Sequence, residues 1–142
     1  MSASAQPERS AGLVIARLDG WRWRLLILRA GRFWDFPRGR MDSGEDAFAA
    51  AKRAATGETG ISEFAFDFGE GYKETIAYAS GSVARYYIAA SDTEQVTLTV
   101  SQEAGRPAQE EWRWITLDEA EDYLPPRLAV VLDWVRDTLD KD

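Results

Sequence analysis

The residues best suited to chemistry lie in one segment, residues 39–61. Five residues of this segment carry the spacing that matters for the argument: Gly39, Glu45, Arg53, Glu58 and Gly60. The chain has no histidine and no cysteine, so carboxylates and water are the metal ligands that remain. Such oxygen ligands suit Mg²⁺ or Mn²⁺ better than Zn²⁺.

Composition narrows the classes of partner. The 142 residues carry a formal net charge of −7, so the molecule as a whole repels polyanions and we expect no broad nucleic-acid binding. A phosphate-bearing small molecule can still bind where cations gather or a divalent metal screens the charge. No apolar run is long enough to span a bilayer, so we expect no membrane partner. A chain without cysteine is compatible with the cytoplasm, and the sequence does not indicate an oligomeric state.

The elements that must position these residues can be read from the apolar pattern. We expect residues 1–10 to be a disordered tail and residues 11–142 to form one domain. Short apolar runs separated by turn residues predict strands at residues 11–19, 23–29, 33–36, 61–69, 72–80, 82–91, 95–100 and 112–117. Residues 117–124 predict a short helix, and Pro125 and Pro126 mark a break before a terminal helix with one buried face: Leu128, Val131, Leu132 and Val135.

The helix inside residues 39–61 has the clearest signals. Ser43 followed by Asp46 resembles a capping box, which would place Glu45 in the first turn. Phe48, Ala51 and Ala55 form a narrow apolar stripe suited to packing on a sheet. This order of elements predicts an α+β fold, with a mixed sheet flanked by helices.

The spacing within residues 39–61 resembles the Nudix box. That family pattern runs Gly, five residues, Glu, seven residues, then Arg-Glu-aliphatic-x-Glu-Glu-x-Gly-aliphatic, and it is matched at Gly39, Glu45, Arg53, Glu58, Gly60 and Ile61. Two of its acidic positions are filled instead by Ala54 and Gly57. The resemblance implies a Nudix fold, in which a loop, helix and loop pack against a mixed sheet and present carboxylates to divalent cations.

The resemblance also implies a role for each matched residue. Glu58 would bind metal and take part in catalysis, and the carbonyl group of Gly39 would be a further metal ligand. Glu45 and Arg53 would form a salt bridge between loop and helix, and Gly60 would permit a turn after the helix. Gly57, which departs from the pattern, is by its own chemistry a candidate to end the helix early as a C-cap, which would make the missing ligand incidental.

Further matches resemble the dinucleoside polyphosphate hydrolase and RNA pyrophosphohydrolase branch of this family, at residues 34–39, 71–78 and 112–114. They imply that Arg38, Arg40 and Lys73 contact phosphates and that Tyr78 stacks on a base. The alternative for Tyr78 is ordinary packing, in the core or at the surface, of a tyrosine in a strand. The branch has a glutamate where this chain has Ala108. Glu110 and Glu111 lie close by in the sequence and are candidates to replace it, or else solvated surface charges.

The leading hypothesis is a hydrolase that depends on Mg²⁺ or Mn²⁺ and splits a nucleoside diphosphate linked to another group, resembling a dinucleoside polyphosphate. The alternative is a catalytically silent Nudix domain that binds a nucleotide as a sensor or binds a protein partner. The loss of carboxylates at Ala54, Gly57 and Ala108 keeps this alternative open, because metal supplies several kcal/mol of charge stabilisation in such reactions.

Overall fold

The computed structural model describes residues 9–76, 82–98, 100–101, 106–107 and 109–140. A seven-stranded mixed sheet has the strand order β3-β2-β1-β6-β5, with β4 beside β1 and β9 beside β2. β1 and β6 are parallel and the other pairs are antiparallel. The strands are β1 (Arg9–Asp19), β2 (Arg22–Ala30), β3 (Phe33–Asp35), β4 (Arg38–Arg40), β5 (Tyr72–Ile76), β6 (Val83–Ala90) and β9 (Glu111–Thr116); β7 (Val100–Ser101) and β8 (Arg106–Pro107) form a separate pair.

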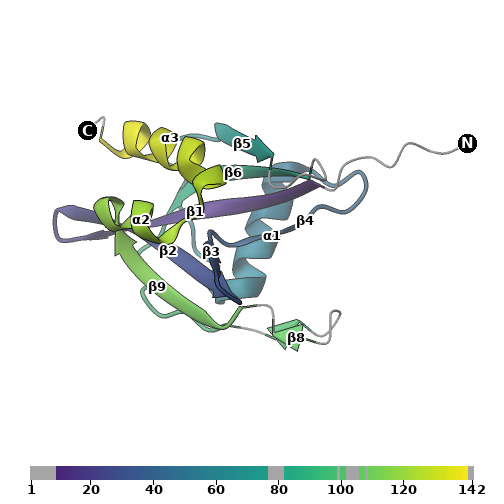
Figure 1. Ribbon diagram of the computed structural model, residues 1–142. Helices are drawn as coiled ribbons and strands as arrows, with labels where there is room; N and C mark the ends of the chain where they lie inside the picture. Colours follow the sequence, from purple (N-terminus) through teal and green to yellow (C-terminus); the bar gives the residue numbers. More distant parts are fainter. Residues whose placement is uncertain (1–8, 77–81, 99, 102–105, 108, 141–142) are drawn as a thin grey trace, which may run out of the picture.

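Helices cover both faces of the sheet, as Figure 1 shows. α1 (Ala47–Thr59) lies on one face, and α2 (Leu117–Tyr123), the short turn η1 (Pro126–Leu128) and α3 (Ala129–Leu139) lie on the other. The central strand serves both layers, because Leu13 and Ile15 pack towards α1 while Val14 and Ala16 pack towards α3. The expected α+β architecture is confirmed. None of the helices in the described part of the chain is long and apolar enough to cross a membrane.

The two ends of the chain follow the sequence closely. Pro126 opens η1, and the four apolar residues expected on one face of the terminal helix, Leu128, Val131, Leu132 and Val135, are all buried. β1 begins at Arg9, two residues earlier than expected, because its backbone pairs with β6 from that position onwards. Residues 1–8 of the expected tail lie outside the described residues.

The start of α1 differs from the sequence prediction. Asp46, and not Ser43, is the N-cap, since its side chain accepts a hydrogen bond from the Ala49 N–H at 2.9 Å. Gly44 has a φ of 77°, which is incompatible with a helix beginning at Ser43. Glu45 therefore precedes the helix and does not lie in its first turn.

The end of α1 also differs from the prediction. The helix continues through Gly57 to Thr59, so Gly57 is not its C-cap. Gly60 takes that position with a φ of 76°, and its N–H donates to the Thr56 carbonyl at 2.8 Å. A side chain at Gly57 would meet open space, so nothing in the backbone or the packing requires glycine there.

Two expected strands are absent from the described residues. Residues 61–69 form a loop whose one ladder contact is the bridge between Ala65 and Ala90. Residues 95–98 are irregular, residue 99 lies outside the described residues, and Val100 is the first residue of β7. Conversely, β4 lies where no strand was expected, and it forms because Arg38–Arg40 pair with β1.

Candidate functional site

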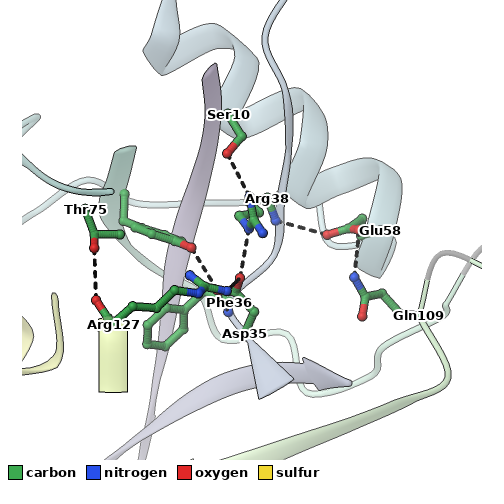
Figure 2. Close-up of polar contacts among 9 residues, drawn as sticks. Ser10, Asp35, Phe36, Arg38, Glu58, Thr75, Gln109 and Arg127 are labelled. Carbon is green, nitrogen blue, oxygen red and sulfur yellow. Dashed lines mark hydrogen bonds and ion pairs between the residues drawn. The ribbon is translucent and has the colours of Figure 1, made fainter. Parts of the chain in front are cut away.

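Glu58 lies in the last turn of α1, where the helix meets the start of β4. Its Oε1 accepts a hydrogen bond from the Arg38 backbone N–H at 3.0 Å, and its Oε2 accepts one from Gln109 Nε2 at 3.1 Å. Figure 2 shows the carboxylate between these two residues. Both donors are neutral, and burial raises the pKa of Glu58 above its ordinary value. Two neutral groups therefore orient the carboxylate, and the nearby charges of Asp35 and Arg38 act on its pKa in opposite directions.

A close approach of β4 to α1 fixes this geometry. A Cβ atom on Gly39 would lie 2.9 Å from the Ala54 Cβ, so glycine at position 39 allows the strand to reach the helix. Ala54 is 7% exposed and fills the contact from the helix side. One of the two positions that lack the expected carboxylate is therefore packed against the backbone of β4, whereas Gly57 is exposed.

The loop before α1 is tied down by Glu45 and Arg53. Arg53 Nε and Nη2 donate to the two oxygens of Glu45, each at 2.9 Å, and Arg53 Nη2 also donates to the Arg40 carbonyl at 3.1 Å. The Asp42 N–H donates to Glu45 Oε1 at 2.9 Å. The hydrogen bonds from Arg53 and then Asp42 hold the pKa of Glu45 below its usual value. The structure thus contains the expected salt bridge between loop and helix.

Asp35 anchors the side chain of Arg38, whose backbone N–H donates to Glu58, as Figure 2 shows. Asp35 Oδ2 accepts from Arg38 Nε at 2.8 Å and from Arg127 Nη2 at 3.2 Å, and Oδ1 accepts from the Tyr86 hydroxyl at 2.8 Å. Arg38 Nη1 donates to Ser10 Oγ at 2.9 Å. Burial, followed by the nearby Asp35 charge, raises the pKa of Tyr86 well above its usual value. Asp35 therefore links β3 and β4 to η1.

The remaining phosphate and base candidates are more dispersed. Arg40 is exposed at the end of β4, and its carbonyl receives the Arg53 hydrogen bond. Lys73 lies in β5 opposite Tyr86 of β6, so its side chain emerges on the face of the sheet that carries Asp35 and Arg38. Tyr78 lies outside the described residues.

Glu110 and Glu111 contact β2, and neither has a hydrogen bond or ion pair with Glu58. Glu110 Oε1 accepts from the Gly31 N–H at 2.6 Å, and its Oε2 lies 3.8 Å from Arg29 Nη1. Glu111 accepts from Arg29 Nε at 3.1 Å and from Arg113 Nε at 3.0 Å. The hydrogen bonds from Arg113 and then Arg29 lower the pKa of Glu111. Both side chains are therefore held by the pairing of β2 with β9.

Gln109 is the residue of this segment that reaches Glu58, and the sequence interpretation missed it. Its Nε2 donates to Glu58, while its Oε1 is buried and accepts no hydrogen bond from the described part of the chain. The one available signal was its position directly after Ala108, where the resemblance implies a glutamate. Asp35 and Arg127 were missed as well, because their contact joins residues 92 positions apart.

The oxygen donors around Glu58 can be tested against a divalent cation. No group of three or more acidic, histidine or cysteine side chains that could hold a metal occurs among the described residues. The Glu58 carboxylate and the unsatisfied Gln109 oxygen lie together, and Gly39 is in the adjacent strand. Mg²⁺ is commonly held by one or two protein oxygens together with water and substrate phosphates. The donor set fits one such cation and does not fit a cluster held by several carboxylates.

Residues 7–135 match the NUDIX domain family. The chain belongs to this family. Among its NUDIX relatives, the rat bis(5'-nucleosyl)-tetraphosphatase [asymmetrical] is 29% identical over 124 residues, which cover 79% of this chain and 81% of that protein. The RNA pyrophosphohydrolase of Bartonella bacilliformis is 23% identical over 135 residues and 78% of each chain.

The fold likewise resembles that of NUDIX proteins of known structure. The Caenorhabditis elegans Ap4A hydrolase, solved as a binary complex, superposes with a TM-score of 0.77 at 24% identity, covering 93% of this chain and 97% of that one. This agreement confirms the Nudix fold expected from residues 39–61.

Proposed function

We propose that this NUDIX protein hydrolyses a nucleoside diphosphate linked to another group, and that its substrate resembles a dinucleoside polyphosphate. The names of its relatives, a tetraphosphatase and an RNA pyrophosphohydrolase, support the choice of substrate class. The observation that carries the proposal is Glu58. Neutral donors fix this carboxylate from two sides, so its negative charge remains available to a cation.

Each residue of the site has a proposed task. Glu58 and the Gly39 carbonyl group would hold Mg²⁺ or Mn²⁺, which when bound neutralises phosphate charge and favours attack by water. Arg38, Arg40 and Lys73 would contact the phosphates, and Tyr78 would stack on a base. In the reaction, water adds to phosphorus and the bond to the leaving phosphate breaks, which gives two phosphate-bearing products. We assign Glu110 and Glu111 to the pairing of β2 with β9.

A second function is a NUDIX domain that binds nucleotide without turning it over. Ala54 and Gly57 favour this alternative, because each occupies a position where the family pattern has a carboxylate. Loss of oxygen ligands weakens the hold on metal and so lowers the rate.

A metal titration that measures nucleotide hydrolysis and nucleotide binding side by side separates the two functions. A dinucleoside tetraphosphate is incubated with the protein at increasing Mg²⁺ or Mn²⁺, and products are quantified beside binding measured by calorimetry. Product formation that rises with metal and stops with a chelator supports the hydrolase. Saturable binding of the nucleotide, with no product at any metal concentration, supports the silent domain and overturns the hydrolase.

A further inference from the structure

Gln109 contacts Glu58, the carboxylate of the proposed site, through the nitrogen of its side-chain amide, whereas the amide oxygen has no partner among the described residues. Its Nε2 donates to Glu58 Oε2 at 3.1 Å. Its Oε1 is buried without a hydrogen-bond donor from the residues that the structure describes. A buried acceptor that lacks a donor is uncommon in proteins and often marks a group that meets a ligand, an ion or water.

We propose that Gln109 is an oxygen ligand of the divalent cation at Glu58, and that its amide group turns over so that Oε1 takes the place now held by Nε2. This inference rests on the proposed function, which puts the cation at Glu58. The two ends of a glutamine amide have nearly the same shape, and the torsion that exchanges them is broad. The exchange therefore requires no movement of the backbone.

The spacing of the two side chains suits neighbouring ligands of Mg²⁺. In an octahedral Mg²⁺ site with bonds of about 2.0–2.1 Å, adjacent ligand oxygens lie about 3 Å apart. Glu58 Oε2 and the Gln109 amide are 3.1 Å apart. The Arg38 N–H meanwhile occupies Glu58 Oε1 and orients the carboxylate, the kind of support that metal-binding carboxylates commonly have.

An amide oxygen from Gln109 would matter in this chain because it has few other side-chain oxygen ligands at the proposed site. Carbonyl oxygens are accepted ligands of Mg²⁺ and Mn²⁺ but bring no negative charge. With Ala54 and Gly57 in the other family positions, Glu58 and Gln109 would be the principal side-chain donors. Glu110 and Glu111, although charged and adjacent in sequence, already accept hydrogen bonds from Gly31, Arg29 and Arg113.

Mn²⁺ binding, measured by the loss of the free-ion electron paramagnetic resonance signal, tests this assignment without relying on activity. The full-length protein is titrated alone and with a non-hydrolysable dinucleoside tetraphosphate. We expect Gln109→Leu to weaken Mn²⁺ binding by about tenfold or more, as for other groups that support a metal site, and Gln109→Glu to strengthen it. Glu110→Gln and Gln95→Leu are matched controls for charge and for glutamine, and we expect both to bind Mn²⁺ like the wild type.

The outcomes separate this inference from the proposed function. Unchanged Mn²⁺ affinity in a Gln109→Leu variant that melts like the wild type overturns the role of Gln109 and leaves the hydrolase standing. Weakened binding in Gln109→Leu, together with a wild type that hydrolyses nothing, supports the role of Gln109 and overturns the hydrolase. A wild type that binds no Mn²⁺, with or without nucleotide, overturns both. If Gln109→Leu does not fold, the affinity of Gln109→Glu decides, and no gain over the wild type overturns the assignment.

Discussion

The two glutamates at the ends of the α1 region have opposite surroundings. Glu45, before the helix, accepts hydrogen bonds from Nε and Nη2 of Arg53, which lower its pKa. Glu58, in the last turn, is held by a backbone N–H and an amide, and burial raises its pKa. A carboxylate with its own arginine is already neutralised, whereas one with neutral donors can still bind a cation. We therefore assign the first glutamate to the architecture and propose that the second serves the chemistry.

The same division explains why the fold persists where family carboxylates are absent. The contacts that shape the loop and helix involve Glu45, Arg53, Gly39 and Gly60, which the chain retains. Ala54 and Gly57 stand where the family pattern has carboxylates. Their substitution leaves the packing of α1 intact, with Ala54 buried against Gly39.

Replacing the chemical glutamate should have the largest effect. Glu58→Gln keeps the shape of the side chain but removes its charge, so we expect metal-dependent turnover of a dinucleoside tetraphosphate to fall by about 100-fold or more. Steady-state kinetics at saturating Mg²⁺ measure this loss. A folded Glu58→Gln variant with wild-type turnover would show that Glu58 is not the functional carboxylate.

Adding a carboxylate beside Glu58 should strengthen metal binding. We expect Gly57→Glu to raise Mn²⁺ affinity by about tenfold, because it adds an oxygen ligand next to the site. Its thermal stability should be unchanged or higher, since Gly57 is helical and exposed and glycine costs a helix up to about 1 kcal/mol. Ala54→Glu is the informative contrast, because a charge placed against Gly39 should lower the melting temperature. A destabilised Gly57→Glu with no gain in affinity would contradict this expectation.

Removing the salt bridge between Glu45 and Arg53 should lower stability more than it lowers turnover. Arg53→Ala leaves Glu45 without its guanidinium and detaches the Arg40 carbonyl, so we expect the melting temperature to fall by a few degrees. Calorimetry measures the shift, and Lys52→Ala on the same helix is the control. Lost turnover in an Arg53→Ala protein of unchanged stability would place Arg53 at the substrate instead.

The smallest expected effect is on the pH dependence of stability, which should change in opposite directions when Glu58 and Glu45 are replaced. Burial raises the pKa of Glu58, so its contribution to stability is present below the ordinary pKa of glutamate and declines as pH rises through the folded value. Hydrogen bonds from Arg53 and Asp42 lower the pKa of Glu45, so its contribution is present above the ordinary pKa and declines as pH falls through the folded value. Between about pH 3 and 8, Glu58→Gln should therefore gain, and Glu45→Gln lose, stability relative to the wild type as pH rises. If the melting temperatures of the two variants, relative to the wild type, changed with pH in the same direction, the distinction between the glutamates would not hold.

The sequence predicted a helix or strand well where its apolar residues followed a single helical or strand period. The apolar stripe of α1 and the buried face of α3 were clear from the sequence, as was the turn at Gly60. The start of α1 was not, because Ser43 and Asp46 are both good N-cap residues and the backbone of Gly44 decides between them. Residues 61–69 alternate like a strand, but Phe66 packs with Phe48 on the α1 side while Phe68 packs with Trp23 on the other side.

The sequence predicted those contacts of the site that lie within residues 39–61 and missed those that join distant segments. Glu45 and Arg53 are close in sequence, and the resemblance placed them together. Gln109 and Glu58 are 51 positions apart, and their contact depends on how the sheet brings the start of β9 to the end of α1. Charge and nearness in the sequence favoured Glu110 and Glu111. In the structure Glu111 already accepts from Arg29 and Arg113, and Glu110 accepts from the Gly31 N–H.

The most direct test of the central claim is phosphorus NMR of a dinucleoside tetraphosphate incubated with the wild-type protein and Mg²⁺ in ¹⁸O-labelled water. The account predicts that the substrate signals disappear and that one product carries an ¹⁸O-shifted phosphate, which shows that water attacked phosphorus. A substrate spectrum that is broadened by binding but unchanged in intensity would contradict the account and establish a silent NUDIX domain.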